Sequence, residues 1–160
     1  MTFVVDGTNG LTFPNSTIQA SAGQVLQVVN AFLNGGVSTT STSLVATGLT
    51  ATITPKFSTS KILIMVSHNA PAKAAVASTD FGLSLYRNGS SLQRIVSDGL
   101  NTGSPSQQLY GTSQSFTHVD SPATTSATTY ATFFQNNGGS SNTVNIQTDN
   151  GTIVLMEIAA

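Results

Sequence analysis

The chain has 160 residues and a formal net charge of -1, and only 7% of its residues are charged, against about 25% in ordinary globular proteins. Its five Lys and Arg residues are scattered between Lys56 and Arg94, so we expect no nucleic-acid partner, because phosphate binding needs a basic cluster. The absence of cysteine excludes disulfide bonds and thiolate metal sites, and no apolar run is long enough for a membrane span. The 21 Ser and 24 Thr residues favour turns and strands, which predicts a single all-β domain.

Residues 1–23 are predicted to be an extended N-terminal arm. The turn signals Asp6-Gly7 and Asn9-Gly10 interrupt this segment, which lacks the basic region and apolar stretch of a signal peptide, so we expect synthesis in a cytoplasm. Its few large apolar side chains cannot bury one another, so they need the surface of the same domain or of a partner. The residues predicted to contact a partner protein or a neighbouring subunit are Phe3, Val4, Val5, Leu11, Phe13 and Pro14.

Residues 24–160 are predicted to be an antiparallel, jelly-roll-like β-sandwich. Apolar and Thr-rich stretches alternate with Gly, Asn, Ser and Pro, and the Asn88-Gly89 pair is typical of a type I′ hairpin turn. Only residues 71–78 could form a helical turn, and a loop over the sheet is the alternative there. The predicted strands, about the number in a jelly roll, are Gln24–Phe32, Ser43–Thr54, Lys61–Ser67, Asp80–Arg87, Ser91–Ser97, Gln114–Asp120, Thr128–Gln135, Thr143–Gln147 and Thr152–Ile158.

Two of these strands carry apolar side chains toward both faces of a sheet. Residues 62–66 read Ile-Leu-Ile-Met-Val and residues 153–156 read Ile-Val-Leu-Met, whereas a strand with one face in water alternates between apolar and polar residues. The second face must therefore be covered by a neighbouring subunit, by the N-terminal arm or by a loop of the same chain. The low charge of the surface also favours assembly, and we predict a homotrimer.

No group of side chains in the sequence points to catalysis or to a bound cofactor. His118 and Asp120 lie two apart on a predicted strand and share a face, but a metal site needs a third ligand and the sequence offers none nearby. His68 is expected to be a partly buried, hydrogen-bonding residue, and the six Asp and Glu residues are widely spaced. We therefore expect no enzyme activity, no metal and no cofactor.

Glu157 is the one charged residue inside an otherwise apolar strand, on the same face as Ile153 and Leu155. A buried carboxylate requires a partner. Two interpretations are open: an ion pair in the core or across a subunit contact, and a solvent-facing position near the end of the strand. The cations available for an ion pair are Arg87, Arg94 and Lys61.

An ordered set of short motifs resembles a module of virion and tail-fibre proteins of tailed bacteriophages. Residues 11–19, Leu-Thr-Phe-Pro-Asn-Ser-Thr-Ile-Gln, resemble its L-T-F-P-[DN]-x-T-x-Q segment, and the Val-Leu-Gln-Val-Val string of residues 25–29 follows as it does there. The later landmarks are Thr47-Gly48-Leu49 with Ile53-Thr54-Pro55-Lys56, residues 60–64, Asp120-Ser121-Pro122 with Thr128-Thr129-Tyr130, and residues 155–158. The resemblance runs from Leu11 to the C-terminus, and it implies a virion β-sandwich, commonly trimeric, with no catalytic residues to carry over.

The resemblance leaves two roles open, both of them in the virion. A capsid decoration (cement) protein would bind the outer capsid surface as a homotrimer, with its arm on the major capsid protein, and stabilise the shell. A short tail-fibre or receptor-binding protein would present loops to host-surface glycans, although the chain has no Trp and only three dispersed Tyr residues for an aromatic sugar platform. A tail fibre usually carries an anchor and a long shaft before such a module, so the sequence favours decoration.

Overall fold

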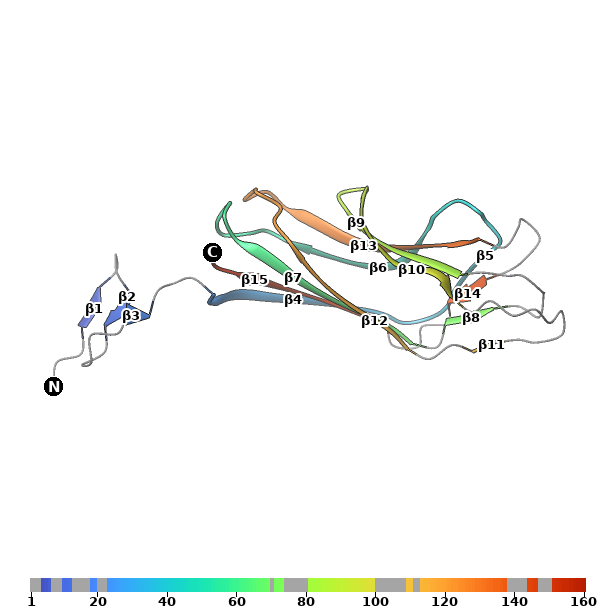
Figure 1. The fold of residues 1–160 in the computed structure, drawn as a ribbon, viewed down its shortest axis with the longest axis horizontal. Helices are drawn as coiled ribbons and strands as arrows, with labels where there is room; N and C mark the ends of the chain where they lie inside the picture. The colour runs from blue at the N-terminus through green and yellow to red at the C-terminus, as the bar shows by residue number, and fades with distance from the viewer. Residues whose placement is uncertain are drawn as a thin grey trace.

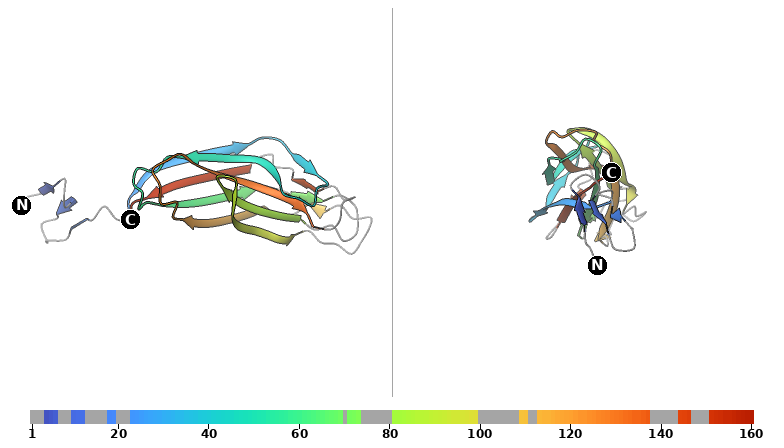
Figure 2. Two further views of the ribbon diagram at one scale, coloured as in Figure 1. Left: turned by 90° about the horizontal axis from the view of Figure 1, so that it is seen from above. Right: turned by 90° about the vertical axis from the view of Figure 1, so that its left-hand side faces the viewer.

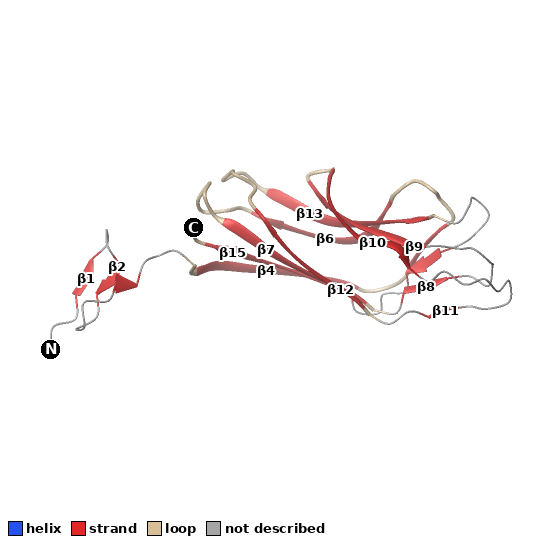
Figure 3. Cartoon of the chain, in the orientation of Figure 1, coloured by secondary structure: helices blue, strands red, loops and turns tan. Residues whose placement is uncertain are grey.

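The part of the chain that the structure describes consists of β-strands and loops (Figure 3). The structure is a computed structural model, which describes residues 4–6, 10–12, 18–19, 23–69, 71–73, 81–99, 109–110, 113–137, 144–146 and 151–160. Side chains are described for residues 23–69, 81–96, 113–137 and 151–160. Within these ranges, no helix has the length and hydropathy to cross a membrane.

Eight long strands form two antiparallel sheets that lie face to face as an elongated sandwich (Figures 1 and 2). The first sheet has the order β12-β7-β15-β4, made of β12 (Gln114–Asp120), β7 (Lys61–His68), β15 (Gly151–Ile158) and β4 (Val25–Leu33). The second sheet has the order β10-β9-β13-β6, made of β10 (Ser90–Gly99), β9 (Phe81–Arg87), β13 (Thr128–Asn136) and β6 (Val45–Ile53). Among these strands only β9 and β10 are successive within one sheet, which is the connectivity of a jelly roll. The predicted all-β antiparallel sandwich is confirmed.

Short strands at one end of the sandwich form a third sheet, of order β11-β8-β14-β5. These strands are β5 (Val37–Thr39), β8 (Pro71–Lys73), β11 (Leu109–Tyr110) and β14 (Val144–Ile146), and of the four only β14 is predicted from the sequence. The helical turn considered from Pro71 onward is wrong at its start, because residues 71–73 pair with β14 and β11 instead. Strand pairing supplies backbone hydrogen bonds without the cost of nucleating a short isolated helix. The rest of that stretch lies outside the described residues.

The N-terminal segment has a small antiparallel sheet of its own. It consists of β1 (Val4–Asp6), β2 (Gly10–Thr12) and β3 (Ile18–Gln19), and Figure 1 draws it apart from the sandwich, beyond the end at which the C-terminus lies. The sequence predicts an arm but no strands within it, because each strand is too short to show a periodicity.

The hairpin between β9 and β10 turns on the two residues that the sequence singles out. Asn88 and Gly89 both have positive φ angles, 48° and 80°, and Arg87 pairs with Ser90 across the turn. Asn88 also binds the neighbouring strand β13: its backbone N–H donates to the Thr129 carbonyl at 2.9 Å, and its Oδ1 accepts from the Thr129 N–H at 2.8 Å. The type I′ turn is confirmed, and it is fastened to the second sheet.

The core lies between the inner faces of the two sheets. Alternate residues of the central strands point inward, so that every second position of β7, β13 and β15 is buried. The main cluster is apolar and spans both sheets: Leu49, Ala51, Ile53, Ile62, Ile64, Val66, Leu85, Tyr130, Ile153 and Leu155. A smaller cluster of Phe81, Leu83 and Phe134 continues the core along the second sheet.

Candidate interaction surface

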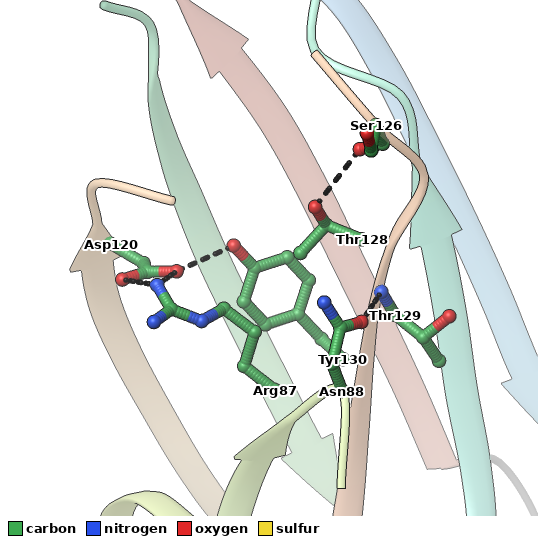
Figure 4. A network of polar contacts seen from close by, with 7 residues as sticks. All are labelled: Arg87, Asn88, Asp120, Ser126, Thr128, Thr129 and Tyr130. Atoms are coloured by element: carbon green, nitrogen blue, oxygen red, sulfur yellow. Dashed lines mark hydrogen bonds and ion pairs between the residues drawn. The ribbon is translucent and has the colours of Figure 1, made fainter. Parts of the chain in front are cut away.

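The titratable side chains of the described core form hydrogen bonds inside the fold: Asp120, Tyr130, His68 and Glu157. Asp120, at the end of β12, accepts two hydrogen bonds from Arg87 Nη1, at 2.9 and 2.8 Å, and one from the Tyr130 hydroxyl at 2.7 Å (Figure 4). Asp120 belongs to the first sheet, whereas Arg87 and Tyr130 belong to the second, so this cluster fastens the two sheets together. Burial, followed by the hydrogen bond to Asp120, raises the pKa of the Tyr130 hydroxyl far above its ordinary value.

The pair of His118 and Asp120 shares the inner side of β12, as the spacing predicts. The Asp120 carboxylate is nevertheless held by Arg87, and the His118 ring stacks on Phe116 at a centroid distance of 6.0 Å. Among the described residues, no three His, Asp or Glu side chains lie close enough together to hold a metal ion. The geometry assigns Asp120 a structural role.

The sequence predicts a partly buried His68, but in the structure the side chain is fully buried. Its Nε2 shares a hydrogen bond of 3.0 Å with Thr132 Oγ1, which in turn lies 2.6 Å from Thr47 Oγ1. Burial lowers the pKa of the imidazole to about 4, so the ring is neutral at physiological pH. A short polar chain of three side chains therefore crosses the apolar core.

Glu157 is buried on the inner face and has no ion pair among the described residues, which corrects both interpretations, the pairing with Arg87, Arg94 or Lys61 and the solvent-facing position. Its carboxylate accepts hydrogen bonds from Gln27 Nε2 at 2.5 Å and from the Lys56 backbone N–H at 2.6 Å, with the Phe57 N–H at 3.4 Å. Burial alone would raise the pKa of Glu157, but these hydrogen bonds hold it below its ordinary value. Backbone amides and a neutral amide thus take the place of a cation.

The outer face of the first sheet carries a group of large apolar side chains, three of which are strongly exposed. Its side chains line up in cross-strand rows, because Val28 pairs with Met156, Met156 with Leu63, and Leu63 with Val119. Val28, Phe32 and Val119 are more than half exposed, at 54%, 67% and 52%. We call this surface the apolar face; its apolar members are Val28, Phe32, Leu63, Met65, Val119, Val154 and Met156.

A hollow lies within the apolar face, over β15, β7 and β12. It is an open depression with a volume of about 330 Å³, lined by Met65, Val66, Ser67, Ser115, Phe116, Thr117, Thr152 and Val154. Phe32 sits beside it on the edge strand β4, opposite Thr152. The apolar face therefore combines a protruding aromatic ring with an adjacent depression.

The apolar face carries almost no charge. The one charged side chain among the outward positions of these four strands is Lys61, at the start of β7, where it lies opposite Ile158. The sequence predicts the two-sided apolar character of β7 and β15, and the structure confirms it, with Ile62, Ile64 and Ile153 buried on the inner side. The contributions of Val28, Phe32 and Val119 are not predicted, because the sequence does not reveal that β4 and β12 flank these strands.

The outer face of the second sheet is different, and we call it the polar face. Its outward positions are mostly small or hydroxyl-bearing, with Thr50 and Thr52 on β6 facing Thr129 and Ala131 on β13. Thr52 and Thr129 share a hydrogen bond of 2.8 Å, and the Thr50 hydroxyl donates to the Tyr130 carbonyl at 3.1 Å. Its one aromatic pair, Tyr86 and Phe133, is packed together with ring centroids 4.4 Å apart.

The arm residues that the sequence selects for contact cannot be placed on either face. Phe3, Phe13 and Pro14 lie outside the described residues, and for Val4, Val5 and Leu11 the structure gives the backbone of the small sheet alone. Their role as a contact surface stays a prediction.

The similarities to known proteins are distant. No family model matches the sequence, and no curated protein matches it. Among solved structures, a chain of T=1 particles derived from infectious bursal virus is similar with 13% sequence identity and a TM-score of 0.46, over 90% of this chain and 39% of that chain. The VP2 subviral particle of infectious bursal disease virus gives 13% identity and a TM-score of 0.42, over 85% of this chain and 38% of that chain. This chain spans about two fifths of the length of both, and the likeness concerns the fold alone.

Proposed function

We propose that this chain is a structural protein of a virus particle, which acts by binding protein surfaces and not by catalysis. The apolar face carries the proposal: seven large apolar side chains line the outer side of one sheet in a chain of very low charge. Such a face is costly in water and is typical of a surface that another protein covers. The carboxylates of Asp120 and Glu157, in contrast, are engaged inside the fold.

Within that class, we propose a capsid decoration protein of a tailed bacteriophage. The support is the ordered set of motifs from Leu11 to the C-terminus, which resembles the bacteriophage virion module. In this role the chain assembles as a homotrimer on the outer capsid surface, its arm lies on the major capsid protein, and the added contacts stabilise the shell. Its location is the virion, after synthesis in the host cytoplasm.

A short tail-fibre or receptor-binding protein is the second candidate. The same motifs support it, because the module they resemble also occurs in tail-fibre proteins. In that role the loops at one end of the sandwich would bind host-surface glycans, and the capsid would not be a partner. The two candidates differ in the surface to which the purified protein attaches.

A binding experiment with the full-length chain separates the two candidates. The purified protein is mixed in parallel with capsids that lack it and with host cells, and bound protein is measured after sedimentation; capsids of an unrelated virus are the control. Decoration predicts saturable attachment to the matching capsids, higher thermal stability of these shells, and no adsorption to cells. Adsorption to cells without capsid attachment would establish the tail-fibre role, and attachment to neither would end the proposal.

A further inference from the structure

The apolar face has a shape and a charge that a second copy of the same chain matches. Proteins select charged partners through complementary charges. The outward positions of β12, β7, β15 and β4, however, carry a single charged side chain, Lys61. Two copies of this face can therefore meet without bringing like charges together. Hydroxyl groups and the amide of Asn30 are interspersed with the apolar side chains and can form hydrogen bonds within such a contact.

Phe32 and the hollow fit each other as a protruding side chain and its socket. A cavity of about 150 Å³ is enough to hold a benzene ring, so a hollow of about 330 Å³ has room for a phenyl group of a neighbour. Phe32 is 67% exposed, the highest value among the large apolar side chains that the structure describes as exposed. An exposed aromatic ring beside a depression of suitable size is the arrangement of an interface anchor.

The positions of the ring and the hollow also allow a closed assembly. Phe32 stands on the edge strand β4, whereas the hollow lies over β15, β7 and β12. Phe32 of each copy can therefore insert into the hollow of one neighbour, while the hollow of that copy holds Phe32 of another neighbour. Such head-to-tail contacts form a closed ring when the rotation that relates one copy to the next is a whole-number fraction of a full turn. A ring of three agrees with the homotrimer of the proposed function.

The extent of the apolar face limits how much of each contact it supplies. Four strands spaced about 4.8 Å apart and eight residues long at about 3.4 Å each span roughly 19 by 27 Å, or about 500 Å² of sheet before the relief of the side chains is counted. A stable interface buries about 800 Å² of accessible surface on each partner. In a ring the apolar face is shared between two neighbours, so it supplies roughly a third of each such contact, and the residues around it must supply the rest.

We propose that the apolar face is the contact between copies of this chain, with Phe32 of one copy seated in the hollow of the next. This inference rests on the proposed function, since it names the partner of the surface that carries that function. It assigns the arm to a different surface and leaves the polar face toward solvent.

Association of the full-length chain tests the contact. Met65→Arg places a charge in the hollow, and Ala46→Arg places the same charge on the polar face, where Ala46 is exposed. Analytical ultracentrifugation should give the wild type and Ala46→Arg about three times the 16.4 kDa of one chain. Met65→Arg should weaken association by about 100-fold or more, because an unpaired charge would be buried, with an unchanged circular dichroism spectrum. A Met65→Arg chain that associates like the wild type, or a wild type that stays monomeric up to about 100 µM, would overturn the proposal.

Disulfide crosslinking maps the same contact without relying on a destabilising charge. The chain has no cysteine, so a Phe32→Cys/Ser67→Cys double variant has no background. Both positions lie opposite Thr152, on the two sides of β15, so they are about 9.6 Å apart within one chain, too far for a disulfide. The matched control is Thr50→Cys/Tyr86→Cys, since both of these positions lie opposite Ala131 on the polar face.

Mild oxidation should produce crosslinked dimers and trimers of Phe32→Cys/Ser67→Cys and leave the control at the mass of one chain. Equal crosslinking of both variants, or none of the first in a chain that still associates, would overturn the contact. The capsid-binding experiment is read separately. If the crosslinked oligomers bind neither capsids nor cells, the proposed function is wrong and the contact between copies stands. If the wild type binds capsids as a monomer, the contact between copies is wrong and the proposed function stands.

Discussion

The two outer faces of the sandwich differ, although the two inner faces are alike. Both sheets send alternate apolar side chains into one core, but outward the first sheet carries Leu, Met, Val and Phe beside a few Ser and Thr residues, and the second carries mostly Thr, Ser, Ala and Gly with one aromatic pair. Two sheets of one sandwich share the same strand propensity and the same core. Under the proposed contact between copies, the difference reflects what lies outside each sheet: water for the polar face and a second copy for the apolar face.

The polar face shows how a sheet in this chain meets water mainly through hydroxyl groups, with Arg94 as a charged side chain on β10. The hydroxyls of Thr52 and Thr129 bind each other across the strands, and Thr50 binds a backbone carbonyl. Threonine keeps the β-branched shape that strands favour and adds a hydroxyl that water can also bind. On the apolar face such hydroxyls are confined to Ser67, Ser115, Thr117 and Thr152, and the remaining outward positions are mostly apolar, which supports an interface there.

Removal of the arm is expected to have the largest effect, and it tests whether the arm or another copy covers the apolar face. A chain without residues 1–23 should attach to capsids at least about 100-fold more weakly, because the arm's apolar side chains each contribute on the order of 1.5–3 kcal/mol when buried. Its mass in ultracentrifugation should stay that of the full-length oligomer. Capsid attachment at full strength would refute the arm assignment, and dissociation into monomers would show that the arm covers the apolar face.

The cluster that fastens the two sheets provides the next prediction. Asp120→Ala should lower the free energy of unfolding by about 2–3 kcal/mol, because Arg87 loses its ion pair and the buried Tyr130 hydroxyl loses its acceptor; Arg87 is partly exposed, which limits the loss. Tyr130→Phe removes a single hydrogen bond and should cost about 1 kcal/mol. Urea unfolding measures both. If the oligomer dissociates in Asp120→Ala while the chain is still folded, the contact between copies depends on the sandwich interior and not on the apolar face alone.

The pH dependence of stability should follow His68. Its folded pKa of about 4 lies below the ordinary value of 6.5, so between these values the unfolded chain binds a proton that the folded chain does not, and stability falls as pH falls. From pH 7.5 to pH 5 the loss should be about 2 kcal/mol. Glu157 stays ionised at pH 5, because its pKa is below the ordinary value.

His68→Gln should remove most of this pH dependence, whereas the matched variant His118→Gln, on the edge strand β12, should keep it. Urea unfolding at the two pH values measures the difference. An equal loss of stability in wild type and His68→Gln would show that other groups control the acid sensitivity of this fold.

The sequence predicts the eight long strands of the sandwich because each has its own apolar pattern and its own turn signals. Residues 45–53 and 128–136 are rich in Thr and apolar residues, with burial that alternates in the structure, and the Asn88-Gly89 pair fixes a hairpin. The short strands β5, β8 and β11 are not predicted, since two or three residues show no periodicity and β8 begins with a proline. These strands form through pairing with distant segments.

The sequence predicts about half of the residues of the apolar face, and the others join it only through the order of the strands in the sheet. Leu63, Met65, Val154 and Met156 are visible in the sequence as apolar residues at consecutive positions. Val28 and Phe32 join them only because β4, far away in the chain, pairs with β15. Likewise, the backbone amides that bind Glu157 come from a loop about 100 residues earlier, and an amide donor leaves no mark in the sequence.

The smallest expected effect compares one phenylalanine on each outer face. Phe133 on the polar face packs against Tyr86, so Phe133→Ala should lower the free energy of unfolding by about 1 kcal/mol and leave association unchanged. Phe32 on the apolar face is 67% exposed, so Phe32→Ala should change the stability of the dilute monomer by less than about 0.5 kcal/mol and weaken association instead. Urea unfolding at nanomolar concentration and ultracentrifugation at micromolar concentration separate the two quantities. A phenylalanine would then contribute to folding on the polar face and to assembly on the apolar face. If both variants changed the free energy of unfolding and neither changed association, the apolar face would not be the contact between copies.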